Sequence, residues 1–147
     1  MPTPSKITTL AQLIAQAESA NNQFATRFEP AYRPNPAHVS VLAKNIDCTY
    51  MTAETLCAMS WGLYQIMGDN LVGMGLTISP LQFCSSPDMQ GLYFARYVQT
   101  ANCNYSLEQI LGDTPTRLDF ARKYNGPGQP ENYAAYLLQI YKNAEQA

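Results

Sequence analysis

Residues 9–20, TLAQLIAQAESA, are the stretch that decides how this chain folds. Thr9 and Gln12 have the form of a capping box, and apolar residues then repeat at the spacing of one helix face. Asn21 and Asn22 follow and supply a stop. The stretch therefore predicts an amphipathic helix over residues 9–20 whose apolar face packs on a core.

Glu18 borders that apolar face and lies in the last turn of the predicted helix. Partial burial disfavours the charged carboxylate, and so does the negative end of the helix dipole. Both effects are expected to raise the pKa of Glu18, as a general acid requires near neutral pH. Many carboxylates at such borders are ordinary solvated residues, so this position alone leaves both interpretations open.

Cap and stop signals predict further helices along the chain. The predicted helices run from Thr52 to Met59, over residues 63–70 after a break at Ser60-Trp61-Gly62, from Ser86-Pro87-Asp88, from Ser106 to Gly112, from Thr114 to Asn125, and from Pro130. On the helix from Pro87 the predicted apolar stripe is Met89, Leu92, Tyr93, Arg96 and Tyr97.

Residues 24–50 contain three prolines and show no sustained period. They are predicted to be a loop with a short strand or two within residues 24–32. The predicted fold class is therefore mainly helical, α+β, with one compact domain over residues 1–147 and a short irregular or β insertion near residues 24–50. A length of 147 residues suits a single domain.

Composition excludes several classes of function. The net charge of −2 and the nine scattered Lys and Arg residues give no basic field, so a nucleic-acid partner is not expected. The apolar runs are too short for a membrane span, and the N-terminus has no secretory signal pattern. Ten tyrosines favour a surface that contacts a neutral ligand such as a sugar, although tyrosines are more often half-buried core.

The cysteines and the histidine do not indicate a metal site or a nucleophile. The spacing of the four cysteines is not that of metal ligands, and they are predicted to be buried thiols: Cys48, Cys57, Cys84 and Cys103. Disulfides would form only in an oxidising compartment. In that case the sequence does not choose among the three ways of pairing four cysteines. His38 is the only histidine and is predicted to be structural, which leaves no base for a serine or cysteine nucleophile. We expect no cofactor, no metal, and cysteines that are dispensable for chemistry.

Three blocks of sequence together carry a family resemblance. They are Glu18-Ser19 with Arg27-Phe28-Glu29-Pro30, then the run from Ser60 to Gly68, SWGLYQIMG, then Tyr124-Asn125-Gly126-Pro127-Gly128 with Asn132-Tyr133. In this order and spacing the chain resembles the lytic transglycosylase branch of the lysozyme superfamily, of the kind common in phage proteins. The resemblance covers nearly the whole chain and implies a lysozyme-like fold.

The resemblance also implies roles for individual residues. Glu18 is implied to be the catalytic acid, and Ser60 to lie near it. Gln65 is implied to lie beside an N-acetyl sugar, and the implied groove also contains Tyr124, Asn125, Glu131 and Tyr133. Each has an ordinary alternative: Gln65 as a helix-surface residue, Ser60 as a cap, Tyr124 as core. Trp61 is predicted to be core rather than a sugar platform.

The implied substrate is the glycan strand of peptidoglycan, cut between N-acetylmuramic acid and N-acetylglucosamine. Lytic transglycosylation would need one carboxylate, with a 1,6-anhydro sugar as the product. Hydrolysis by a muramidase would need a second carboxylate, for which the candidates are Glu29, Asp47, Glu54 and Glu131. The resemblance favours Glu131 among them, because it comes just before Asn132-Tyr133. A third possibility is a non-catalytic virion or secretion-machine component that binds peptidoglycan. The presence of Glu18, Gln65 and Tyr124-Asn125 is an argument against it.

The predicted setting follows from the same resemblance. We expect a monomer made in the cytoplasm without a signal peptide that acts on the cell wall in the periplasm, or from a phage virion. Phage tail or secretion-machine proteins are the further candidate partners. The cleft is predicted to lie between residues 24–50 and the helices that hold Gln65 and Tyr124.

Overall fold

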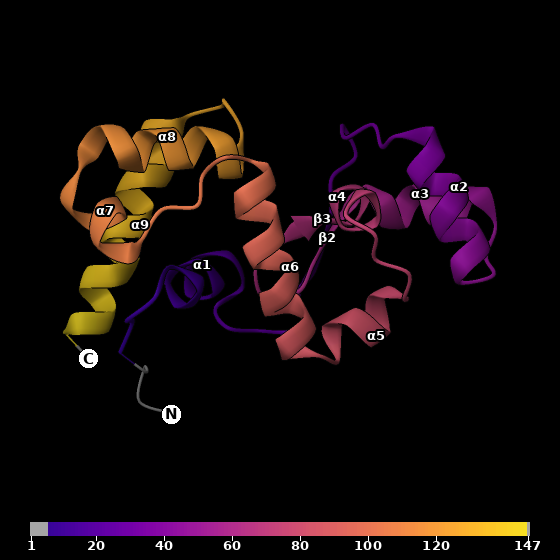
Figure 1. Cartoon of the computed structure of the whole chain (residues 1–147), viewed down its shortest axis with the longest axis horizontal. Coiled ribbons are helices and arrows are strands. Elements are labelled where there is room, and N and C mark those ends of the chain that lie inside the picture. Colours follow the sequence, from indigo (N-terminus) through magenta and orange to yellow (C-terminus); the bar gives the residue numbers. More distant parts are fainter. Residues whose placement is uncertain (1–5, 147) are drawn as a thin grey trace. The chain divides into compact units, whose positions relative to one another are not determined.

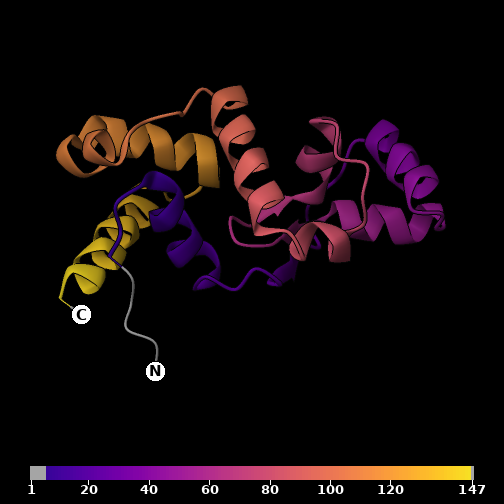
Figure 2. The same ribbon diagram turned by 60° about the horizontal axis from the view of Figure 1, so that its bottom comes forward.

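The computed structural model describes residues 6–146 of the chain. Within them the structure is mainly helical and contains one small three-stranded sheet (Figures 1 and 2). This confirms the predicted mainly helical, α+β class. The chain divides into two compact units. We call Glu18–Tyr97 the central unit, and residues 6–17 with 98–146 the terminal unit.

The central unit contains the sheet, whose antiparallel strands are β1 (Thr26–Phe28), β2 (Met59–Trp61) and β3 (Ile66–Met67). In the register Arg27 lies opposite Ser60, and Phe28 lies opposite Met59. Opposed residues of antiparallel strands share a face, and neighbours along a strand alternate between faces. Ser60 and Phe28 therefore lie on opposite faces of the sheet.

The helices of the central unit are α2 (Pro36–Asn45), α3 (Tyr50–Cys57), α4 (Gly68–Gly73), α5 (Pro80–Cys84) and most of α6 (Pro87–Thr100). Helices α2, α3 and α4 pack on one another, and both views show them grouped (Figures 1 and 2). Trp61 lies in the core of this unit and is 1% exposed. Its indole N–H donates to the Leu56 carbonyl at 3.0 Å, and its ring meets the Phe83 ring edge-on. The prediction that Trp61 is core is confirmed.

Residues 36–45, predicted to belong to an irregular loop, instead form α2. The Asn35 side chain accepts from the Ala37 N–H at 2.9 Å, and Pro36 occupies the first helical turn, which is a favourable helix start. Only Val39 and Leu42 of this helix are buried. Two buried positions give a weak periodic signal, which is why the sequence pattern missed the helix. The short strand predicted within residues 24–32 is confirmed by β1.

The prediction of helix over residues 63–70 is also wrong, because the chain forms a hairpin turn there before α4 begins at Gly68. Gly62 has φ 83° and Gln65 has φ 50°. Both values lie in the left-handed region, which an α-helix cannot contain. The close pairing of β2 with β3 therefore overrides the local helical pattern.

Two smaller differences concern α3 and α6. Helix α3 begins after Thr49 rather than at Thr52, because the Thr49 hydroxyl accepts from the Thr52 N–H at 3.2 Å. On α6 the predicted stripe is only partly right, since Tyr93 is buried but Leu92 is 52% exposed. The buried positions of α6 are Gln90, Tyr93, Phe94 and Val98.

The terminal unit contains most of α1 (Leu10–Ser19), together with α7 (Leu107–Gly112), α8 (Thr114–Asn125) and α9 (Pro130–Glu145). The helices predicted in these places are confirmed, and so are the capping boxes at Thr9 and Ser106. Asp113, rather than Thr114, caps α8 by accepting from the Thr116 N–H at 3.0 Å. No helix within residues 6–146 is long and apolar enough to cross a membrane.

Polar contacts join the helices of the terminal unit. The Arg117 guanidinium donates to the carbonyls of Ile110 at 2.7 Å and Leu111 at 3.2 Å, which satisfies carbonyls in the last turn of α7. The Tyr136 hydroxyl of α9 donates to the Ala17 carbonyl near the end of α1 at 3.0 Å. Helix α9 therefore satisfies a terminal carbonyl of α1.

The four cysteines are free thiols. Cys57, Cys84 and Cys103 are buried, as predicted, whereas Cys48 is partly exposed. Burial raises the pKa of each buried thiol, to about 12 for Cys57, where the nearby Asp69 carboxylate adds to the effect, and to about 11 for Cys103. These thiols are poor nucleophiles near neutral pH, because the thiolate is the reactive form.

We expect the free energy of unfolding to decrease as the pH rises above about 9. Cys57 and Cys103 ionise near their ordinary pKa of 9.0 in the unfolded chain, but keep their protons to about 12 and 11 in the fold. The folded state therefore binds more protons over this range, and raising the pH favours unfolding. Thermal midpoints at several pH values between about 8 and 10.5 measure the effect. A Cys48→Ser variant should show the same pH dependence of the thermal midpoint as the parent, whereas Cys57→Ala should show a weaker one. A parental thermal midpoint that does not change over this pH range would contradict the prediction.

Candidate functional site

Glu18 stands in the last turn of α1, where the sequence predicted it. Its side chain is half-buried, and no basic residue occupies that turn. The chain leaves the helix through Ala20 and Asn21, with φ values of 51° and 62°. Partial burial and the last-turn position are the two features on which the prediction for Glu18 rests, and the structure contains both. The catalytic role of Glu18 stays a prediction.

Ser60 and Gln65 are brought together by the hairpin turn between β2 and β3. The Ser60 hydroxyl donates to Gln65 Oε1 at 2.6 Å, and Gln65 Nε2 donates to the carbonyls of Ala25 at 3.1 Å and Gly62 at 3.0 Å. Both amide hydrogens of Gln65 are thus used within the protein, and its oxygen keeps capacity for a ligand. The alternative interpretations, Gln65 as a helix-surface residue and Ser60 as a helix cap, are wrong, because Gln65 is not on a helix and Ser60 is in β2.

Gln90 of α6 holds this turn in place, although its side chain is fully buried at 0% exposure. Gln90 Oε1 accepts from the Leu63 N–H at 2.7 Å, and Nε2 donates to the carbonyls of Phe83 at 3.2 Å and Cys84 at 3.0 Å. A Cβ at Gly62 would lie 2.2 Å from Gln90 Oε1. Only glycine therefore fits at position 62, both for its positive φ and for this close approach.

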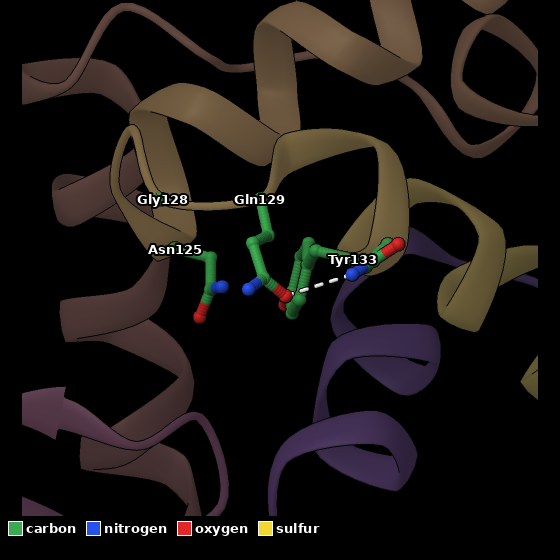
Figure 3. A pocket seen from close by; sticks show the side chains of 5 residues that line it. Asn125, Gly128, Gln129 and Tyr133 are labelled. Carbon is green, nitrogen blue, oxygen red and sulfur yellow. Dashed lines mark hydrogen bonds between the residues drawn. The ribbon is translucent and has the colours of Figure 1, made fainter.

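A pocket of about 430 Å³ opens in the terminal unit where α8 ends and α9 begins (Figure 3). It is lined by Asn125, Gly128, Gln129, Asn132 and Tyr133. In Figure 3 the side-chain amides of Asn125 and Gln129 point toward the same space. The Asn132 amide donates to Gln129 Oε1 at 2.7 Å. Neutral amides beside a tyrosine suit the hydroxyl and acetamido groups of a sugar.

Tyr124 and Glu131, the other two candidates of the terminal unit, are not among the residues that line this pocket. The Tyr124 ring stacks on the Phe120 ring, with centroids 5.2 Å apart and planes 11° apart. That contact agrees with the alternative interpretation of Tyr124 as a packing residue. Glu131 is exposed in the first turn of α9. The functional roles implied for both residues stay predictions.

The predicted site residues thus fall into one group in each unit. The central unit holds Glu18, Ser60 and Gln65, and the terminal unit holds Tyr124, Asn125, Glu131 and Tyr133. A hydrogen bond joins Ser60 to Gln65, and a shared pocket joins Asn125 to Tyr133. The cleft predicted between residues 24–50 and the helices that hold Gln65 and Tyr124 would contain residues of both units, and it stays a prediction.

The candidate second carboxylates of the central unit have other surroundings. Glu29 forms an ion pair with Arg27, with 2.5 Å between Glu29 Oε1 and Arg27 Nε. Asp47 is exposed in a turn, with φ 53°. Glu54 is exposed on α3 and lines a different pocket, which also contains Phe28. Each of these three carboxylates therefore has surroundings of its own, and a role as second carboxylate stays a prediction for each of them.

The sequence did not reveal Gln90, Asp69 or Gln129. A signal for Gln90 was present, because it lies in helical phase with the apolar Phe94 and Val98. For Asp69 there was none, since its partner Tyr32 is 37 positions away in the chain. His38 is structural, as predicted, and its partner is Asp69, with 2.7 Å between His38 Nδ1 and Asp69 Oδ1.

Comparisons with known proteins are consistent across nearly the whole chain. A family model described as N-acetylmuramidase matches residues 7–145. The endolysin of Enterobacteria phage PRD1 is 33% identical over 142 residues, which cover 89% of this chain and 93% of the phage protein. No solved structure matches the chain. Both matches extend over the central and the terminal unit.

Proposed function

This chain belongs to the N-acetylmuramidase family, and on that premise we propose that it cuts glycan strands by lytic transglycosylation. Membership of the family and likeness to a phage endolysin make it a peptidoglycan-cleaving enzyme. The proposal concerns the bond and the product. The bond is the β-1,4 link between N-acetylmuramic acid and N-acetylglucosamine, and the product carries a 1,6-anhydro ring on the muramoyl sugar.

Glu18 is the proposed acid and base. Its carboxyl protonates the glycosidic oxygen as the bond from that oxygen to the muramoyl C1 breaks, and N-acetylglucosamine leaves with a free hydroxyl. The resulting carboxylate then takes the proton of the muramoyl 6-hydroxyl, whose oxygen bonds to C1. Glu18 is thereby returned to its protonated form. The observation that carries this assignment is the half-buried carboxyl in the last turn of α1.

Neutral groups in both units are proposed to hold the sugars. The amides of Asn125 and Gln129 and the ring of Tyr133 provide one set, in the pocket of the terminal unit. Ser60 and Gln65 provide a second set, on a turn whose internal hydrogen bonds fix its shape before a ligand arrives. Neutral donors and acceptors can bind acetamido and hydroxyl groups without adding charge to the binding surface.

Transglycosylation is preferred to hydrolysis because it needs only one carboxylate. Hydrolysis would require a second carboxylate to act as nucleophile or to orient water. Glu29 is already paired with Arg27, which is an argument against its use for this purpose. The likeness to an endolysin further supports a role in degrading the wall of a host cell, with the enzyme made in the cytoplasm as one lysozyme-like domain.

The experiment that tests the proposal is a product analysis. The full chain is incubated with purified peptidoglycan, and the soluble muropeptides are separated and weighed. We expect muramoyl ends that lack one water relative to hydrolysed ends and that resist borohydride reduction. Reducible ends would identify a hydrolytic muramidase, and the absence of any soluble fragment would contradict the assigned activity.

A further inference from the structure

A second pocket, in the central unit, is not used by the proposed reaction. It has a volume of about 230 Å³ and lies between the segment from Phe28 to Pro36 and helix α3. Phe28 and Tyr50 line it with aromatic rings and are 50% and 47% exposed. Because Phe28 and Ser60 lie on opposite faces of the sheet, this pocket is separate from the Ser60–Gln65 turn. We call it the Phe28 pocket.

The Phe28 pocket carries one positive and one negative side chain. Arg33 and Glu54 both line it, and within residues 6–146 neither forms an ion pair. Arg33 Nη1 donates to the carbonyls of Pro30 at 2.8 Å and Tyr32 at 3.3 Å, so the backbone holds the guanidinium in place. Its remaining N–H groups suit a carboxylate, and Glu54 suits an ammonium group.

The wall of the pocket is held by Asp69, which is only 8% exposed. Asp69 accepts from the Tyr32 hydroxyl at 2.8 Å and from the Asn35 N–H at 3.2 Å, and it also pairs with His38. The irregular segment that carries Arg33 is therefore fixed to α4 on both sides of that residue. A pre-formed wall lowers the cost of ordering on ligand binding.

We propose that the Phe28 pocket binds the peptide stem of peptidoglycan, an inference that rests on the proposed function. The stem carries carboxylates and a free amino group on short aliphatic chains. Arg33 would bind a carboxylate, Glu54 the amine, and the rings of Phe28 and Tyr50 would cover the aliphatic carbons. A neutral sugar would leave both charges without a partner. The pocket would then select wall that still carries its peptides.

The test uses the full chain and two soluble probes. One is the stem tetrapeptide L-alanyl-γ-D-glutamyl-meso-diaminopimelyl-D-alanine, and the other is an N-acetylglucosamine tetramer. Each is titrated into ¹⁵N-labelled protein, and amide shifts are followed by NMR. The tetrapeptide should shift signals within residues 28–36 and 50–55, whereas the sugar tetramer should not. Shifts elsewhere only, or shifts here with the sugar and not with the peptide, would overturn the proposal.

Variants distinguish a site that recognises charged groups from an apolar surface that binds the peptide nonspecifically. Arg33→Gln and Glu54→Gln should each raise the Kd for the tetrapeptide about tenfold or more, because a charge-assisted hydrogen bond is lost. Arg122→Gln and Glu108→Gln, which change exposed residues of α8 and α7, should bind as the parent does. Parental affinity in both pocket variants would overturn the proposal. Cleavage of peptide-free glycan by the parent tests the proposed function separately, so the two can fail independently.

Discussion

Glu18→Gln is expected to release soluble fragments from peptidoglycan about 10² to 10⁴ times more slowly than the parent, the range typical of losing a positioned acid. The amide keeps the size of the side chain and its hydrogen-bonding capacity but has no proton to transfer. The variant should still bind glycan and should fold normally. Its thermal midpoint should be equal to the parental one or slightly higher, because a half-buried group that can become charged has been replaced by a neutral one.

The measurement compares turbidity loss of a cell-wall suspension, binding to insoluble wall, and the thermal midpoint at equal protein concentration. Glu108→Gln is the matched control, because Glu108 is an exposed carboxylate in the first turn of α7. It should clear the suspension at the parental rate. If folded Glu18→Gln protein clears the wall as fast as the parent does, Glu18 is not the acid.

Gln90→Leu is expected to lower the free energy of unfolding by about 3 kcal/mol. The Leu63 N–H would lose its acceptor, and a buried donor without a partner costs about 1–3 kcal/mol. The carbonyls of Phe83 and Cys84 would each lose a donor as well, although Ser86 and Gln23 still donate to them. For a chain of this size the thermal midpoint should fall by about 6–12 °C.

The same variant should cleave wall about 10- to 100-fold more slowly at a temperature where it remains folded. Gln90 holds the turn that carries Gln65, and a small displacement of a positioning group has a large effect on rate. Gln99→Leu is the control, because Gln99 lies on the same helix but is exposed. A folded Gln90→Leu variant with both parental stability and parental rate would show that the turn does not depend on this side chain.

The sequence alone determined the helices whose signals are local. Thr9, Ser106 and Pro130 begin helices because caps and first-turn prolines act within three or four residues of themselves. The same local rule placed Glu18 in the last turn of α1, at the edge of the buried face. The order of the three motif blocks was enough to indicate a lysozyme-like, peptidoglycan-cleaving family, which the N-acetylmuramidase match confirms, whereas the transglycosylase branch stays a prediction.

Features that depend on distant partners became visible only in the three-dimensional structure. Helix α2 and the hairpin turn at Gly62 were mispredicted because local periodicity is weak in one and misleading in the other. Gln90 supports the Ser60–Gln65 turn through a hydrogen bond with Leu63, which lies 27 positions away in the chain. Asp69 holds the wall of the Phe28 pocket through bonds with residues 31 to 37 positions away. Local patterns record which face of an element is apolar. They do not indicate which buried polar group on one element forms hydrogen bonds with the backbone of another. Such long-range hydrogen bonds determine the shape of both the Ser60–Gln65 turn and the Phe28 pocket.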